Sequence, residues 1–367
     1  MRGLSSVPSY VVMQPTTLCN LDCAYCYLPF RAADRRMPVG VAEAVAETVN
    51  HWASTARFSV VWHGGEPLAA GREQLAALMA PFAPGVEHHV QTNATLIDDT
   101  WCEFFVAHRM RVSVSVDGPR ERNGERVTRA GQPAYDRIVR GVAALRRHGL
   151  PFSALAVVND PSPGRATELY DYFLDLGCEV LGVNIEETEG VNIRANAHDA
   201  AAVTGFWAEL VSAWRRDPRI HLREVEWSLR YAGAVLDGTA DALLPGRLDP
   251  IPTVAYDGSV VVLSPELAGF TDPRYGDFTS GNVLTTPLHT ILAGADRTAW
   301  VGEFVDGVEA CRASCPYFGF CGGGHAANRY FELGRFDGTE TEHCRNSKIR
   351  LLEGVLEHAR DHQSPGA

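Results

Sequence analysis

Short apolar runs alternate with helical patterns over the first half of the chain. Six runs rich in β-branched or apolar residues read as buried strands of a parallel sheet, at 10–14, 58–62, 88–91, 112–116, 153–158 and 180–185. Between them, apolar residues recur at helical spacing, as in Val41, Val45, Val49 and Trp52. Strand–helix units in sequence predict a parallel α/β sheet with right-handed crossovers.

The pattern changes in the second half. An apolar helical stripe from Val203 to Trp214 should end at Asp217-Pro218, because the residue before a proline is pushed out of the helical region. Residues 219–250 predict a bridging segment with an aromatic helix around 227–236. Asp257-Gly258 is a hairpin signal within 253–263, and a Cys- and Gly-rich region and a final helix follow. We therefore expect three parts, namely 1–218, 219–250 and a smaller domain at 251–367.

Composition excludes several classes of protein. The formal net charge of −12 argues against a nucleic-acid partner, which needs clustered Lys and Arg. No apolar run approaches the roughly 18 residues of a membrane helix, and no signal pattern opens the chain. Seven of the nine cysteines form two groups with metal-like spacing, which favours a reducing cytoplasm. We expect the other two, Cys102 and Cys178, to be small buried hydrophobic residues.

The first cysteine group is Cys19, Cys23 and Cys26, at CxxxCxxC spacing on one predicted loop. Three thiolates there could hold three corners of a [4Fe–4S] cluster and leave the fourth iron open to a ligand. A structural zinc site is the alternative, but it needs four ligands, and no fourth Cys or His lies nearby.

With Tyr25 just before its last Cys, this loop resembles the signature of the radical SAM superfamily. The resemblance implies an enzyme with a partial (β/α)6 barrel, in which S-adenosylmethionine (SAM) binds the open iron of the cluster. The alternative is an iron–sulfur or zinc binding protein without turnover.

Polar residues at the ends of the predicted strands could complete a SAM site. The run Gly64-Gly65-Glu66-Pro67 follows the second strand and resembles the motif that binds the methionyl amino group, with Glu66 as the main contact. Other strand-end or loop candidates for SAM or substrate contact are Asn93, Ser115, Asp117, Arg126 and Asn184. Arg126 ends a stretch that in the family usually reads His-Asp-x-x-Arg, but here the His-Asp pair is missing.

The second cysteine group could close either a zinc site or a second [4Fe–4S] cluster, by spacing alone. Its members are Cys311, Cys315, Cys321 and Cys344. The segment resembles the SPASM domain, which commonly carries seven cysteines for two auxiliary clusters. Ser264 and His325 stand where that pattern has further cysteines. The resemblance therefore implies one auxiliary cluster, fully ligated by protein and used for electron transfer, with His325 as a loop residue or substrate contact.

Over residues 9–355 the chain resembles maturases that form three-residue cyclophanes in ribosomally made peptides. The resemblance rests on Trp62 to Pro67, Val262 to Phe278, Gly281 to Val283 and Cys321 to Cys344. It implies hydrogen-atom abstraction from a precursor peptide by a SAM-derived radical, a bond from an aromatic ring to a Cβ, and a flavodoxin or ferredoxin type reductant.

Three alternatives stay open: peptide epimerisation, thioether formation, and one-residue oxidation as in sulfatase maturation. Carboxylates placed to accept a proton are Asp117, Glu186, Glu187 and Glu266. Because the chain starts at its first strand, we expect leader recognition to use the barrel rim, the bridging segment or the C-terminal domain.

Overall fold

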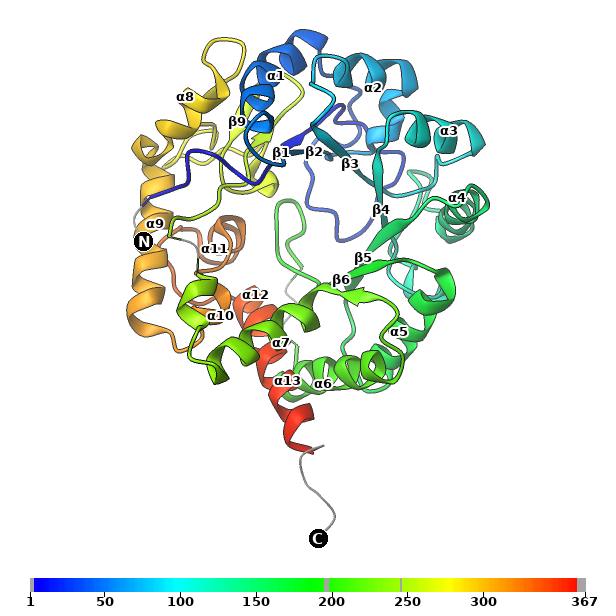
Figure 1. The fold of residues 1–367 in the computed structure, drawn as a ribbon, viewed down its shortest axis with the longest axis vertical. Helices are drawn as coiled ribbons and strands as arrows, with labels where there is room; N and C mark the ends of the chain where they lie inside the picture. The colour runs from blue at the N-terminus through cyan, green and yellow to red at the C-terminus, as the bar shows by residue number, and fades with distance from the viewer. Residues whose placement is uncertain (1–2, 195–197, 245, 362–367) are drawn as a thin grey trace.

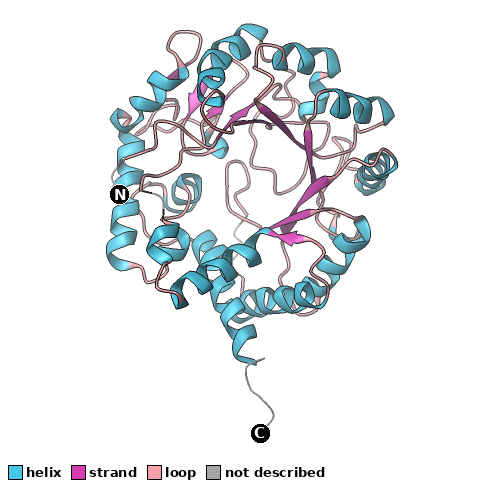
Figure 2. Ribbon diagram, in the orientation of Figure 1, coloured by secondary structure: helices cyan, strands magenta, loops and turns pink. Residues whose placement is uncertain are grey.

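A ring of strands and helices surrounds the centre of the molecule (Figures 1 and 2). This computed structural model describes residues 3–194, 198–244 and 246–361. The six predicted strands are present and pair in parallel and in chain order. They are β1 (Tyr10–Met13), β2 (Ser59–Trp62), β3 (Glu87–Thr92), β4 (Arg111–Ser115), β5 (Phe152–Val158) and β6 (Val180–Ile185). The predicted α/β partial barrel is thus confirmed.

Helices cover the outer face of this sheet (Figure 1). They are α1 (Val39–Ala53), α2 (Arg72–Met79), α3 (Asp99–Ala107), α4 (Tyr135–Arg147), α5 (Arg165–Leu176) and α6 (Ala200–Arg216). In β5 every second residue is buried, and the alternate residues Leu155 and Val157 line the central cavity. The strand period of two therefore separates a face that packs on helices from a face that forms the cavity wall.

The sheet continues beyond the barrel strands on both sides. β8 (Thr253–Val254) pairs in parallel with β1, and an antiparallel hairpin at Asp257-Gly258 leads to β9 (Ser259–Val261). β10 (Gly281–Asn282) and β7 (His221–Leu222) form the two edges. The predicted hairpin is confirmed, while the division at residue 250 stays a prediction because the sheet is continuous across it.

Further helices complete the ring between β6 and β9 (Figure 1). They are α7 (Arg223–Leu236), α8 (Leu288–Ala293), α9 (Ala299–Ser314), α10 (Phe318–Cys321), α11 (Ala326–Leu333), α12 (Glu342–Cys344) and α13 (Arg350–Asp361). The helix α6 ends at Arg216, as the Asp217-Pro218 pair predicts. α13 packs along α6, and Trp207 Nε1 donates to the carbonyl oxygen of Asn346 at 2.8 Å.

Two further sequence expectations can be compared with the described residues. Cys102 and Cys178 are both buried, at 0% and 5% exposed, as predicted for small apolar side chains. No helix in the described ranges is long and apolar enough to cross a membrane.

Candidate functional site

The strands converge on a central cavity of about 670 Å³. Cys19, Cys23 and Cys26 all line it. Seven further residues that the sequence suggested for cofactor binding line the same cavity: Tyr25, Gly65, Glu66, Asn93, Ser115, Arg126 and Asn184. Gly64, Pro67 and Asp117 do not line it but lie directly behind, next to residues that do.

The loop that carries the first cysteines is held by backbone hydrogen bonds. Cys19 N–H donates to the carbonyl of Arg31 at 2.9 Å, and Asp22 N–H donates to that of Val127 at 2.8 Å. Burial raises the pKa of the Cys19 thiol to about 12 and that of Cys23 to about 11. The thiolates therefore need a positively charged partner to form here, as a bound metal would provide.

The donor set of this loop fits an iron–sulfur cluster. No three His, Cys, Asp or Glu side chains of the described residues converge on a single metal ion. Each thiolate of a four-iron cluster binds a different iron, so its cysteines need only surround a common space. In addition, the side-chain amide of Asn93 donates to Cys19 Sγ at 3.8 Å. Such hydrogen bonds to sulfur are one means by which proteins adjust a cluster.

Gly65 brings the Gly-Gly-Glu-Pro turn against the cysteine loop. Its φ is +65°, and a Cβ at this position would lie 2.7 Å from the carbonyl oxygen of Leu18. The next residue, Glu66, donates its N–H to that same oxygen at 2.8 Å. Only glycine meets both requirements without strain. The turn therefore fixes the position of Glu66 relative to Cys19.

The carboxylate of Glu66 organises the end of β3. It accepts hydrogen bonds from Leu68 N–H (3.0 Å), Thr92 Oγ1 (2.7 Å) and Asn93 N–H (2.8 Å). Burial raises the pKa of this carboxyl to about 7, and the three hydrogen bonds oppose that rise. A carboxylate has roughly four acceptor positions. One thus remains for a ligand, and direct contact with SAM stays a prediction.

Asp117 binds protein groups rather than facing the cavity. It pairs with Arg126 through two hydrogen bonds, at 2.9 and 2.8 Å, and accepts a hydrogen bond from the Tyr25 hydroxyl at 2.6 Å. The backbone N–H of Val157 donates to it at 3.0 Å. The Arg126 guanidinium also lies 5.4 Å from the centre of the Tyr25 ring. Asp117 therefore positions Tyr25 and Arg126 in the cavity wall, and its own contact with SAM stays a prediction.

Ser115 and Asn184 hold neighbouring polar side chains in the wall. Ser115 Oγ accepts from Gln91 Nε2 at 2.7 Å, and Asn184 Oδ1 accepts from Arg223 Nη2 at 3.0 Å. β3 and β4 thus present one polar pair, and β6 and α7 present a second, at the C-terminal edge of the sheet.

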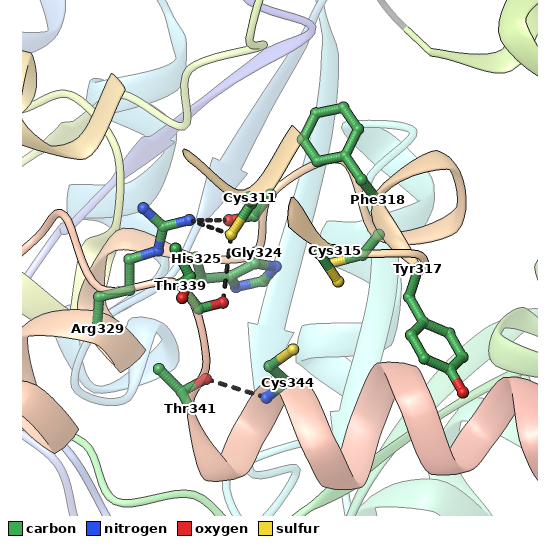
Figure 3. A pocket seen from close by; sticks show the side chains of 12 residues that line it. Cys311, Cys315, Tyr317, Phe318, Gly324, His325, Arg329, Thr339, Thr341 and Cys344 are labelled. Carbon is green, nitrogen blue, oxygen red and sulfur yellow. Dashed lines mark hydrogen bonds between the residues drawn. The ribbon is translucent and has the colours of Figure 1, made fainter. Parts of the chain in front are cut away.

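The second cysteine group surrounds a narrow pocket next to the central cavity (Figure 3). Cys311 and Cys315 lie at the end of α9, Cys321 ends α10 and Cys344 ends α12. In Figure 3 the sulfur atoms of Cys311, Cys315 and Cys344 point into one space. Gly323 has a φ of +110°, and a Cβ at this position would lie 2.8 Å from Val308 Cγ1. The turn between Cys321 and His325 therefore requires glycine here.

A buried guanidinium indicates that this pocket holds negative charge. Arg329, 3% exposed, donates to Cys311 Sγ at 3.3 Å, to the Gly323 carbonyl at 2.6 Å and to the Phe336 carbonyl at 2.9 Å. No carboxylate of the described residues lies within ion-pair distance of it. An uncompensated buried cation is costly. Four thiolates around a metal cluster would provide the counter-charge, so the residues present fit such a group.

His325 separates the two cavities, because its side chain lines both. Burial lowers the pKa of its imidazole to about 3, so the ring is neutral. It lies 5.2 Å from the His343 ring, and His343 Nδ1 is 2.9 Å from Glu187 Oε1. The sequence suggested a loop residue or substrate contact for His325. The contact between His325 and His343 was missed, because 17 positions separate them and only tertiary packing brings them together.

Three carboxyl groups share the wall near His343. Burial opposes ionisation of Glu187, but His343 and Asn328 lower its pKa. Burial and the charge of Glu187 together raise the pKa of Glu189, a residue that the sequence did not single out. Burial raises the pKa of Glu266 to about 7. Glu186, a fourth carboxylate, is bound by Arg194 and Asn192. Glu266 thus differs from Glu186 and Glu187 in having no basic partner in the described ranges.

Comparison with known proteins adds to this picture. Residues 13–173 match the family model of the radical SAM superfamily. An uncharacterized protein of Synechocystis sp. is 33% identical over 366 residues, which cover 94% of this chain and 90% of that protein. A serine-type anaerobic sulfatase-maturating enzyme of Bacteroides thetaiotaomicron is 32% identical over 188 residues, 47% of this chain and 45% of the enzyme.

Solved structures share the fold. The enzyme anSMEcpe with bound AdoMet superposes with a TM-score of 0.74 at 22% identity, over 97% of this chain and 98% of that one. SuiB of Streptococcus suis, bound to the precursor peptide SuiA, superposes with a TM-score of 0.63 at 17% identity, over 92% and 76%.

Proposed function

Because the chain belongs to the radical SAM superfamily, we propose that it joins an aromatic ring to the β-carbon of a nearby residue in a ribosomally made peptide. The observation that carries this proposal is the central cavity of about 670 Å³, which contains the first cysteine group and shares His325 with the pocket of the second. The first group lines it directly, and the second is separated from it by His325. A reaction that removes a hydrogen atom and then an electron needs both groups close to one substrate.

We assign the cofactors by the residues that fit them. Cys19, Cys23 and Cys26 would hold a [4Fe–4S] cluster with SAM, and the acceptor position left on Glu66 would bind the ammonium group of SAM. Cys311, Cys315, Cys321 and Cys344 would hold the auxiliary cluster. When bound, SAM and the first cluster supply hydrogen-atom abstraction from an unactivated carbon, and an external one-electron donor starts each turnover.

The protein itself must position the peptide and take up a proton. When a carbon radical attacks an aromatic ring, the ring regains aromaticity by losing one electron and one proton. Glu266 is suited to accept the proton because its pKa of about 7 is matched to a neutral working pH. The second cysteine group is where we place the electron acceptor.

A second candidate is one-residue oxidation, as in sulfatase maturation. The similarity to the Bacteroides thetaiotaomicron enzyme favours it. Both reactions remove two hydrogens. Ser264 and His325, at positions where the two-cluster pattern has cysteines, favour the crosslinking reaction.

Anaerobic co-expression with the short peptide encoded beside this gene tests the proposal. The peptide is analysed by intact mass and fragmentation, in ordinary and in heavy water. We expect loss of two hydrogens, with fragmentation blocked across a short segment that contains an aromatic residue. Loss of two hydrogens at one residue, with reactivity toward a carbonyl reagent, would establish one-residue oxidation instead. An unchanged mass with one solvent deuterium gained would indicate an epimerase.

A further inference from the structure

The chain has a single lysine, and its side chain lines the central cavity. Lys348 is the one lysine among 33 Lys and Arg residues, so the other 32 are arginine. It lies on the cavity wall together with His325, His343 and Glu187. Apart from histidines, every other basic side chain is thus a guanidinium. The one ammonium side chain lies where substrate would bind.

An unusual backbone turn presents this lysine. Residues Arg345–Ile349 form a π-helical turn between α12 and α13, in which Arg350 N–H donates to the carbonyl of Arg345. A π-turn inserts one residue into a helix and shifts the side chains that follow, and such turns are frequent at functional sites. The turn starts directly after Cys344, so the position of Lys348 is tied to the second cysteine group.

Lys348 is also the cation that the wall leaves without a partner. Apart from histidines, the wall has two other basic side chains, both arginine. Arg126 binds Asp117, while Arg223 binds Glu224 and Asn184. In the described part of the chain, no hydrogen bond or ion pair involves the ammonium group of Lys348. An ammonium drawn partly out of water gains from an anionic partner.

The surrounding charge makes this lysine selective. Glu186 and Glu187 lie on the same wall, so an anion that enters the cavity is repelled by their carboxylates. Lys348 offers the local exception. A peptide carboxylate is repelled by the glutamates and attracted by Lys348, so the peptide should bind in a single register.

Its place in the ring points to substrate rather than SAM. The segment between α12 and α13 lies across the ring from β1 and β2 (Figure 1). The cysteine loop and the Gly-Gly-Glu-Pro turn follow β1 and β2, and they are where we place SAM. A long, flexible side chain with a compact charge is suited to reach a carboxylate across such a space.

We propose that Lys348 is a specificity-determining residue that binds a carboxylate of the peptide substrate, either an Asp or Glu side chain or the C-terminus. This rests on the proposed function, because it takes the substrate to be a peptide. The carboxylate contact fixes which residue of the peptide faces the cysteine loop.

Matched peptides and variants test the contact. Binding is measured anaerobically by fluorescence anisotropy, with the short peptide encoded beside this gene and with copies in which each carboxylate in turn is an amide. For the wild type we expect one of these changes to raise Kd by about 10- to 100-fold, the usual range for a charged hydrogen bond. For Lys348→Met the acid and amide peptides should bind equally, and Lys348→Arg should restore part of the preference. Arg350→Met, which removes a charge from the next turn that pairs with Glu353, should keep the wild-type preference.

The single lysine provides a readout that needs no variant. An amine-reactive acetylating reagent has two targets in this chain, Lys348 and the α-amino group. We expect the acid peptide to slow acetylation of Lys348 at least tenfold and to leave the α-amino group unaffected. Equal protection by SAM alone, or an acid preference that Lys348→Met retains, would overturn the proposal. If wild-type enzyme binds the peptide but modifies none, the proposed function fails while the binding test still decides the role of Lys348.

Discussion

At the scale of single residues, Glu266 and Arg329 are two ionisable side chains with different surroundings. Burial raises the pKa of Glu266 to about 7, whereas Arg329 is a buried cation beside the sulfur of Cys311. The two side chains lie on different cavities. Their substitution should therefore affect different steps.

Glu266→Gln should stop crosslink formation while hydrogen-atom abstraction continues. A base with a raised pKa must be ionised to act, so wild-type kcat/KM should fall as the pH drops below about 7, by about tenfold per unit. The variant should lose about 10²- to 10⁴-fold in crosslinking rate and lose that acid limb. The measurement is crosslinked peptide and 5′-deoxyadenosine from pH 5.5 to 8.5.

Glu226→Gln, on the exposed side of α7, is the control and should behave as wild type. An unchanged acid limb in Glu266→Gln would assign the proton acceptor elsewhere.

Arg329→Gln should lower the reduction potential of a cluster bound by the second cysteine group. Reduction adds negative charge, which the guanidinium stabilises, so its removal should shift the midpoint to more negative values by on the order of 100 mV. The shift is measured by EPR-monitored titration in protein whose Cys19, Cys23 and Cys26 are alanine. Arg329→Lys should recover part of it.

The surface variant Arg312→Gln changes a charge one residue from Cys311 and should leave the midpoint in place. A midpoint that Arg329→Gln does not move would show that the charge acts only on folding.

At the scale of elements, the contact between the Gly-Gly-Glu-Pro turn and the cysteine loop is open to a paired test. In Gly65→Ala the alanine would have to adopt a positive φ, and its Cβ would lie 2.7 Å from the carbonyl oxygen of Leu18. We therefore expect at least a few-fold lower iron content and SAM affinity. Gly71→Ala has φ +88° and open space around it, and it should cost only the backbone strain of about 1–3 kcal/mol. Iron analysis and SAM binding by calorimetry compare the two.

Equal losses in both variants would mean that the close approach to Leu18 does not matter.

The sequence predicts these elements well where periodicity is strong. The six barrel strands are found within one or two residues of their predicted ends, and α6 ends just before Asp217-Pro218. The parallel pairing of β8 with β1 was not predicted, because the partners are 241 residues apart, as for Val12 and Thr253, and short strands carry no register signal. Likewise, the meeting of Glu187 with His343 depends on tertiary packing, which no local pattern encodes.

At the scale of the whole molecule, α6 and α13 join the first half of the chain to its last helix. They are in close contact at Gly354, where a Cβ would lie 2.6 Å from the carbonyl oxygen of Thr204 and 2.8 Å from Cβ of Trp207. Gly354→Ala should therefore lower the melting temperature by several degrees, from about 1–3 kcal/mol of overpacking. Differential scanning calorimetry gives the shift.

Gly205→Ala is the matched control in α6, because nothing lies within 4 Å of its added Cβ. Alanine favours helix by up to about 1 kcal/mol, so this variant should be unchanged or slightly more stable. A higher melting temperature for Gly354→Ala would mean that the two helices separate without cost.

The single lysine gives the folded chain one cleavage point for an endoprotease that cuts after lysine. Such an enzyme would separate residues 349–367, including α13, from all seven clustered cysteines. Because Lys348 lies in a hydrogen-bonded turn, cleavage requires that turn to open, and its rate follows the population of the open form when closing is fast. The rate of this single cleavage therefore reports how often the turn before α13 opens. It can be followed on a gel as the appearance of two fragments, without any label.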